Sequence, residues 1–204
     1  MSAPLSNPSS LEKTGFRLND AGFFYNGSQY RYEELVTTFR VRQRFEMQYV
    51  GVGSDYTHSV GIYFEMLSGQ KVKLIEQPTW TSEGKPENVD KLEEIYRNVS
   101  EKTFQTRIQR YIDQVNARGF FVYDDWTFHT VNRTITEPNG GRVHNLDDVT
   151  LFKKYGVIEV RRRNEGIAAK LGRAIGHKTV INTLQNTDVF FSLLAIYYAI
   201  EWKT

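Results

Sequence analysis

Residues 39–49 decide the fold of the first half of the chain, because they carry the clearest strand pattern in it. They read Phe39-Arg40-Val41-Arg42-Gln43-Arg44-Phe45-Glu46-Met47-Gln48-Tyr49. Every even position is polar, and every odd position except Gln43 is apolar. This period of two predicts a half-buried β-strand with an apolar face and an opposite face of arginines.

Two further strands are expected after this stretch. Val60, Ile62, Phe64 and Met66 again alternate with other residues, and residues 71–75 form a third strand after a turn at Ser68-Gly69. The three strands are predicted to form an antiparallel meander. On the N-terminal side, Asn26-Gly27 follows a short apolar run and signals a tight hairpin.

A helix is expected between Pro86 or Asn88, which signal a helix start, and Gly119, which signals a stop. Apolar residues recur along it at helical spacing, but the step from Val99 to Phe104 interrupts the stripe. The interruption predicts a kink, or the start of a second helix, near Ser100.

The pattern then returns to strands, with turns at 138–141 and at Gly156. The expected strands lie at 120–123, 126–131, 149–160 and 179–184, and a final helix opens at Asn186 or Thr187. The two halves resemble each other in this order and in detail. Tyr32-Glu33-Glu34-Leu35 after Gly27 corresponds to Leu146-Asp147-Asp148-Val149 after Gly141, at a constant offset of 114 positions. Gly69-Gln70-Lys71 and Gly176-His177-Lys178 form another matched pair, which favours a duplicated unit.

A meander of antiparallel strands closed by a C-terminal helix resembles the pleckstrin-homology (PH) fold, and the step at Tyr32 to Leu35 looks like the early strands of bacterial PH-like domains. The fold expected from this resemblance is α+β, with two tandem PH-like units. Each would be an antiparallel sheet or partial barrel with a C-terminal helix. The expected boundaries are a flexible tail at 1–12, unit one with a long helix at 13–118 and unit two at 119–204. The resemblance implies a binding scaffold for phosphoinositides or proteins, and only rarely an enzyme.

Composition limits the class of protein. A chain of 204 residues with 40% hydrophobic residues can bury a sizeable core. The absence of cysteine excludes disulfides, thiolate zinc sites and cysteine nucleophiles. No secretory signal is visible, and the longest apolar stretch, 189–200, is too short to span a membrane. The cytoplasm is therefore the expected location.

No catalytic, metal or cofactor site is predicted. The four histidines, His58, His129, His144 and His177, form no metal-ligand spacing and are interpreted as ordinary strand or loop residues. Adjacent carboxylates at 124–125 and 147–148 point to opposite faces of a strand, so turns are the better interpretation. No phosphate-binding glycine loop and no nucleophile elbow occurs.

Two basic features are the candidate binding sites. Arg40, Arg42 and Arg44 share one strand face and are spaced to clamp an anionic partner; the alternative is a solvated face with cross-strand partners such as Glu65. The second feature covers residues 161–178, with Glu165 as its one acidic residue; it is either a short basic amphipathic helix for an anionic surface or a solvated loop. Its candidate binding residues are Arg161, Arg162, Arg163, Lys170 and Arg173.

The last helix has almost no polar face, and one helix on one sheet buries only a stripe. We expect the surplus to pack between the units, with a homodimer through helix 187–200 as the alternative. The function expected overall is non-enzymatic protein binding, in the form of an immunity-type neutraliser of a cognate toxin or effector. The alternative is a peripheral membrane adaptor that binds anionic lipid headgroups through the basic patches. A nucleic-acid partner is disfavoured because the net charge is only +2.

Overall fold

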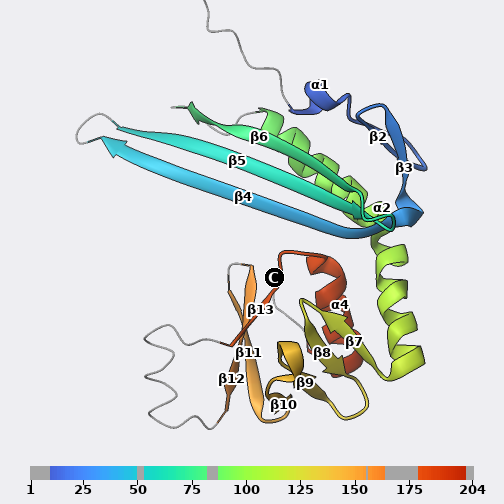
Figure 1. Cartoon of the computed structure of the whole chain (residues 1–204). Helices are drawn as coiled ribbons and strands as arrows, with labels where there is room; N and C mark the ends of the chain where they lie inside the picture. Colours follow the sequence, from blue (N-terminus) through green and yellow to red (C-terminus); the bar gives the residue numbers. More distant parts are fainter. Residues whose placement is uncertain (1–9, 50–52, 82–86, 155, 164–178, 201–204) are drawn as a thin grey trace, which may run out of the picture. The chain divides into compact units, whose positions relative to one another are not determined.

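The alternating stretch at residues 39–49 is a strand, and it belongs to a longer strand at one edge of an antiparallel sheet in the computed structural model (Figure 1). The structure describes residues 10–49, 53–81, 87–154, 156–163 and 179–200. The chain divides into Met1–Phe104, called unit 1 here, and Gln105–Thr204, called unit 2. The division falls inside a long helix, whose first part belongs to unit 1 and whose second part belongs to unit 2.

The described residues form a mixed α+β structure with four antiparallel sheets. The elements of unit 1 are α1 (Ser10–Thr14), β1 (Arg17–Leu18), β2 (Gly22–Tyr25), β3 (Ser28–Arg31), the 3₁₀ turn η1 (Tyr32–Glu34), β4 (Leu35–Tyr49), β5 (Gly53–Met66), β6 (Lys71–Thr81) and the first part of α2 (Glu87–Arg118). The elements of unit 2 are the rest of α2, β7 (Phe120–Tyr123), β8 (Trp126–His129), β9 (Thr134–Thr136), the 3₁₀ turn η2 (Pro138–Gly140), β10 (Val143–Asn145), β11 (Val149–Lys154), β12 (Val157–Arg162), β13 (Val180–Asn182) and α4 (Thr187–Tyr198).

The first half of the chain confirms the predicted meander and hairpin. The sheet order β4-β5-β6 follows the sequence, and β1-β2-β3 form a separate small sheet. Asn26 and Gly27 join β2 to β3 with φ of 49° and 77°. Two consecutive positive φ values are those of a type I′ hairpin turn, whose twist matches that of the paired strands.

A β-bulge near the start of β4 sets which side of this strand faces the core. Leu35 pairs with Met66, but the next pair is Thr37 with Glu65, so Val36 is an extra residue. One extra residue moves every later side chain to the other face. Beyond the bulge, Arg40 lies opposite Ile62 and Arg42 opposite Val60, and both β5 partners are buried.

The prediction for β4 is therefore right about the strand and wrong about its faces. The arginine positions lie on the core side of the sheet, where long side chains reach helix α2. Arg42 forms an ion pair with Glu93 at 3.3 Å, and the Arg40 guanidinium lies 5.1 Å from the ring centroid of Tyr96. The apolar positions share the other face, where the rings of Phe39 and Tyr63 are 5.2 Å apart.

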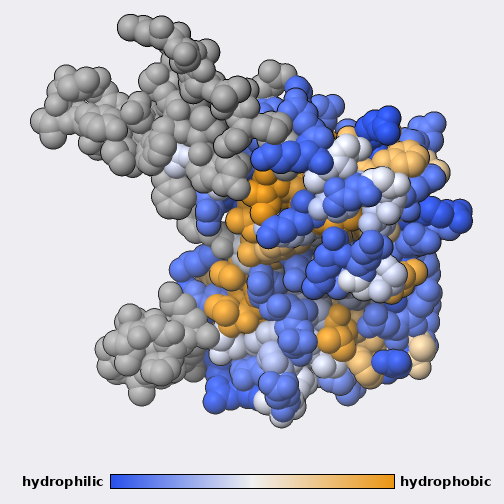
Figure 2. Space-filling view, turned by 45° about the horizontal axis from the view of Figure 1, so that its top comes forward, coloured by the Kyte–Doolittle hydropathy of each residue, from blue (hydrophilic) through white to orange (hydrophobic). Residues whose placement is uncertain are grey.

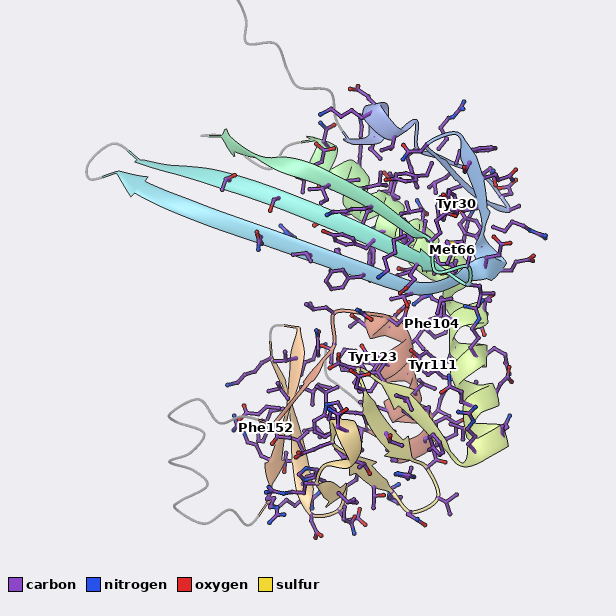
Figure 3. All side chains as sticks on the ribbon, viewed as in Figure 1. Tyr30, Met66, Phe104, Tyr111, Tyr123 and Phe152 are labelled. Carbon is purple, nitrogen blue, oxygen red and sulfur yellow. The ribbon has the colours of Figure 1, made fainter. Side chains whose placement is uncertain are left out.

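The core of unit 1 combines both sheets with the first part of α2. In Figure 3, Tyr30 of β3 and Met66 of β5 mark two sides of it. Phe23 lies at its centre, because its ring stacks on Phe16 and Tyr30 and also contacts Phe64. The buried side chains of this core are Phe16, Phe23, Tyr30, Tyr32, Leu35, Val60, Ile62, Phe64, Met66, Val72, Leu74, Val89, Leu92 and Val99.

Helix α2 runs as one element from Glu87 to Arg118, so the predicted second helix near Ser100 does not occur. The interruption in the apolar stripe has a different cause. Val99 ends the set of α2 residues in the unit 1 core, whereas the buried Arg107 contacts Asn186 and Asp188 of unit 2. The helix changes its packing partner at the interruption, and Gly119 ends it with φ of 75° as expected.

Unit 2 contains a four-stranded sheet, β10-β9-β8-β7, and a three-stranded sheet, β11-β12-β13, followed by α4. Asp124 and Asp125 form the two-residue turn of the β7–β8 hairpin with φ of 49° and 62°, which confirms that these carboxylates are turn residues. Phe190 of α4 attaches the helix to this sheet, since its ring stacks on Tyr123 with centroids 3.8 Å apart and meets Phe128 edge-on at 5.3 Å.

Arg107 is fully buried and ties the second part of α2 to the start of α4. Its guanidinium donates two hydrogen bonds to Asp188, Nη1 to Oδ1 at 2.9 Å and Nη2 to Oδ2 at 2.6 Å. A third goes to Oδ1 of Asn186, the residue before α4, at 3.0 Å. Tyr111, one turn further along α2, also hydrogen-bonds Asn186; burial raises the pKa of the Tyr111 hydroxyl, while this bond and the Arg107 charge lower it.

Several expected details differ from the structure. Ser10–Thr14 is helical, so the tail predicted over 1–12 ends earlier. The last helix ends at Tyr198 rather than 200, because Ala199 takes a left-handed conformation with φ of 56°. The sheets of each unit do not close into a barrel among the described residues.

Of the sequence matches that suggested a duplicated unit, the acidic steps have similar structures in the two halves and the glycines do not. Gly27 sits in a two-residue turn, whereas Gly141 follows the 3₁₀ turn η2 and has an extended conformation, so these glycines are not equivalent. The acidic steps at 32–35 and 146–149 do match: each is a tight turn between the first and second sheets of its unit, with buried apolar ends and exposed acidic residues. The second half of the other matched pair, 176–178, lies outside the described residues.

Replacing Asp188 with alanine should lower the free energy of unfolding by about 3–5 kcal/mol, because it leaves a buried guanidinium without its carboxylate. Urea unfolding followed by circular dichroism measures the change. Asp113→Ala, at an exposed α2 position, is the control and should stay within about 0.5 kcal/mol of wild type. Adding Arg107→Met to Asp188→Ala should recover stability, since no buried charge remains; no recovery would contradict this account.

The assignment of faces on β4 predicts energetic coupling between Arg42 and Glu93. In a double-mutant cycle with Arg42→Glu and Glu93→Arg, the double variant should be more stable than the sum of the single changes by about 0.2–1 kcal/mol. Gln43 occupies the opposite face in the same register, so Gln43→Glu should show no coupling to Glu93→Arg. Coupling to Gln43 instead of Arg42 would show that the faces are reversed.

Candidate functional site

A cleft in unit 2 is the candidate binding site, because it gathers polar and charged side chains from three separate segments. Its volume is about 440 Å³. The end of β10, the turn 146–148 with the start of β11, and the end of β12 form its walls. Its lining residues are Val143, His144, Asn145, Asp147, Asp148, Val149, Arg162 and Arg163.

Strand pairing brings these segments together. Val149 pairs with Arg162 at one end of the β11–β12 ladder, which places the end of β12 beside the turn that precedes β11. The backbone N–H of Arg163 donates to the carbonyl of Asp148 at 2.9 Å, and its Nε donates to the carbonyl of Val149 at 3.3 Å. The turn is closed by the N–H of Asp148, which donates to the carbonyl of Asn145 at 3.0 Å.

Both signs of charge line the cleft. Arg162 and Arg163 are exposed, as are Asp147 and Asp148 of the turn. Asp147 also lies 3.8 Å from Arg133, in an ion pair that is largely exposed to solvent. Exposed pairs of this kind stabilise a fold by less than about 1 kcal/mol, so these charges remain able to exchange partners.

His144 and Val149 are the buried side chains of the lining, and His144 is the polar one of the two. Its Nε2 lies 2.8 Å from Oε1 of Glu137, and its ring is 6.2 Å from that of Trp126. Together these contacts fix the orientation of the imidazole. In the part of the chain that the structure describes, no group of three or more histidine, aspartate or glutamate side chains is arranged to hold a metal ion.

The structure separates the three adjacent arginines that the sequence grouped. Arg162 and Arg163 line the cleft, whereas Arg161 lies on the other face of the sheet, where Thr150 and Arg161 form a pair. There its guanidinium lies 4.1 Å from the Phe152 ring centroid and donates to Glu159 Oε2 at 2.6 Å. That hydrogen bond raises the pKa of Arg161. Lys170 and Arg173 lie outside the described residues.

Glu159 explains why Arg161 is unavailable as a binding residue. Its side chain is only 2% exposed and also has Lys154 at 3.7 Å, so two cations compensate one buried carboxylate. The Arg40 and Arg42 side chains are likewise engaged, with α2 rather than with Glu65, whose cationic neighbour is Lys71 at 3.8 Å. For Arg44 the structure describes the backbone pairing, opposite His58.

The surface otherwise carries scattered hydrophobic residues. On the face shown in Figure 2 they form small patches separated by hydrophilic residues. The most exposed large ones include Val131, Leu67, Val143 and Ile196. Ile196 belongs to α4, whose buried side is made by Val189, Phe190, Leu193, Leu194 and Tyr198, so part of the apolar surplus of this helix remains at the surface.

Sequence reasoning identified Arg162 and Arg163 but missed the rest of the cleft. Asp147 and Asp148 were correctly interpreted as turn residues, yet the turn becomes part of a site only when Val149 pairs with a residue thirteen positions later. Nothing in the local pattern specifies that pairing. A comparison with protein-family models, curated proteins and solved structures finds no match to this chain. None of its described helices is both long and apolar enough to cross a bilayer.

Arg161→Ala should lower the free energy of unfolding by about 1–3 kcal/mol, because Glu159 loses its closest cation inside a buried site. Arg162→Ala changes an exposed residue of the same strand and should cost no more than about 0.5 kcal/mol. Thermal and urea unfolding of both variants measure the difference. Equal stability of the two variants would show that Arg161 does not neutralise Glu159.

Proposed function

We propose that this chain is a non-enzymatic protein-binding module built from two PH-like units. The order of elements supports the proposal, since in each unit a first antiparallel sheet is followed by a three-stranded sheet and then by a helix. The matching acidic turns between the two sheets support it further. A scaffold of this kind offers edges, clefts and sheet faces to a partner, and its function is decided by those surfaces.

The unit 2 cleft contains both positive and negative side chains, and this favours a protein partner over a lipid headgroup. Asp147 and Asp148 stand in the same cleft as Arg162 and Arg163. A lipid phosphate bound to the arginines would lie near two carboxylates, which repel it. A polypeptide carries both signs of charge and can match both, which is how charged interfaces obtain specificity.

The alternative, a peripheral membrane adaptor, receives less support. Of its proposed anchors, Arg40 and Arg42 contact α2, and Arg161 neutralises Glu159. A headgroup would compete with these contacts, most strongly at Arg161, whose partner Glu159 is buried. The cleft arginines are the anchors that this alternative retains.

The narrower form of the proposal is an immunity-type inhibitor that neutralises a cognate toxin or effector in the cytoplasm. An inhibitor needs surface complementarity alone, and a cleft with four charged residues suits specific recognition. The product of a neighbouring toxin-like gene would be the first partner to test. Rescue of growth when both proteins are produced together would support inhibition.

The proposal is tested by affinity capture with matched variants. The tagged wild-type chain should retain one partner protein from a native lysate of its source, and the double variant Asp147→Lys/Arg163→Glu should lose it by at least about tenfold, since two interfacial contacts become repulsive. Arg142→Glu, an exposed residue outside the cleft lining, should retain it.

Sedimentation with vesicles containing phosphatidylserine tests the alternative in the same series. Under the present proposal, wild-type chain stays in the supernatant at physiological salt. Salt-sensitive sedimentation that Arg162→Ala/Arg163→Ala abolishes would favour the membrane adaptor and contradict protein recognition through the cleft.

A further inference from the structure

Strand β4 lies at an open edge of its sheet. The sheet order is β4-β5-β6, so among the described strands β4 is hydrogen-bonded only to β5. An edge strand presents backbone donors and acceptors that can form a ladder with another chain. From Thr37 to Tyr49 the pairing with β5 continues without a register shift, which keeps this edge regular over a long distance.

The other edge of the same sheet is protected in the ways that natural proteins use. Strand β6 carries Lys71, Lys73 and Pro78, and its pairing with β5 is interrupted by a register shift. Lysine, proline and bulges all hinder the addition of a further strand. In unit 2, the edge strand β11 is six residues long and ends in Lys153-Lys154, and β13 has only three residues.

The segment Phe39–Tyr49 of β4 is charged, at Arg40, Arg42, Arg44 and Glu46, but has no bulge. It contains no proline, glycine or lysine, and eleven residues exceed the usual strand length of about five or six. In Figure 1 the paired ends of β4 and β5 extend well past the beginning of α2. The charges of this segment hinder the addition of an unmatched strand, so a strand added to this edge must carry complementary charges.

We propose that the Phe39–Tyr49 edge binds an extended segment of a partner protein as an added strand. This inference rests on the proposed function, protein binding, and specifies its mode. The chemistry of the segment follows from the register. Acidic residues would lie beside the positions of Arg40, Arg42 and Arg44, and apolar residues beside those of Phe39 and Val41, in strict alternation. Arg40 and Arg42 contact α2 but are exposed, so an acidic strand would compete with Glu93 for Arg42.

A second copy of the chain fits this edge less well. In antiparallel self-pairing centred on any residue from 41 to 44, an arginine of one copy lies directly opposite an arginine of the other. Pairing centred on Phe45 places Arg44 opposite Glu46 but leaves Arg42 opposite Gln48. Like charges in opposite positions destabilise a ladder. An acidic partner strand turns the same positions into attractive pairs, and each such pair contributes about 0.2–1 kcal/mol.

The test uses a fluorescent peptide of alternating valine and glutamate, flanked by Ser-Gly, and the full chain. Fluorescence anisotropy should report binding, and hydrogen exchange measured by mass spectrometry should slow in the segment 39–49. A peptide with lysine in place of glutamate should bind about tenfold more weakly, because three pairs become repulsive. A Val-Glu peptide N-methylated at every second amide should not bind, because it cannot form the ladder.

Matched variants locate the site. Arg40→Glu/Arg44→Glu should weaken binding of the Val-Glu peptide by about tenfold, whereas Arg163→Glu, in the unit 2 cleft, should leave it unchanged. Circular dichroism confirms that each variant is folded. Wild-type chain at the same concentration should not dimerise through β4 in analytical ultracentrifugation.

Three results would overturn strand addition: no binding of the Val-Glu peptide, slowed exchange at residues 143–149 in place of 39–49, or a dimer whose formation protects β4. The first two would leave the proposed function intact if affinity capture still depended on Asp147 and Arg163. Capture that survives Asp147→Lys/Arg163→Glu but is lost in Arg40→Glu/Arg44→Glu would instead show that the edge, rather than the cleft, is the binding surface.

Discussion

The extra residue at Val36 is the constraint on which the surfaces of unit 1 depend. Because strand side chains alternate with a period of two, one inserted residue reverses the faces of everything beyond it. Arg40 and Arg42 therefore reach across the core side to α2, and Phe39 meets Tyr63 on the opposite face. A strand without the bulge would direct its arginines to that opposite face and its apolar side chains into the core.

Unit 2 depends on a different kind of interaction. Arg107 of α2 is fully buried. Its guanidinium donates hydrogen bonds to Asn186 and Asp188 at the start of α4. A bidentate arginine–carboxylate pair defines orientation as well as distance. Two residues after Asp188, Phe190 packs on Tyr123 and Phe128, so polar and apolar contacts hold the same end of α4.

The same rule explains which arginines are held within the fold. A guanidinium next to a buried or half-buried carboxylate is held by it, as Arg161 is by Glu159 and Arg42 is by Glu93. The exposed Arg162 and Arg163 share their cleft with Asp147 and Asp148, which favours a partner carrying both signs of charge. Charge counted along the sequence overestimates the basic character of these surfaces, since much of it is neutralised across the fold.

Local patterns in the sequence determined the elements: the alternation in 39–49, the Asn26-Gly27 turn, the paired aspartates at 124–125 and the glycine that ends α2 all act over a few residues. The faces of β4, the continuity of α2 and the cleft were decided only by the tertiary structure. A bulge, a change of packing partner and the pairing of Val149 with Arg162 each depend on contacts between distant residues. Such contacts leave no periodic trace in the chain, because each one involves a single position rather than a repeated one.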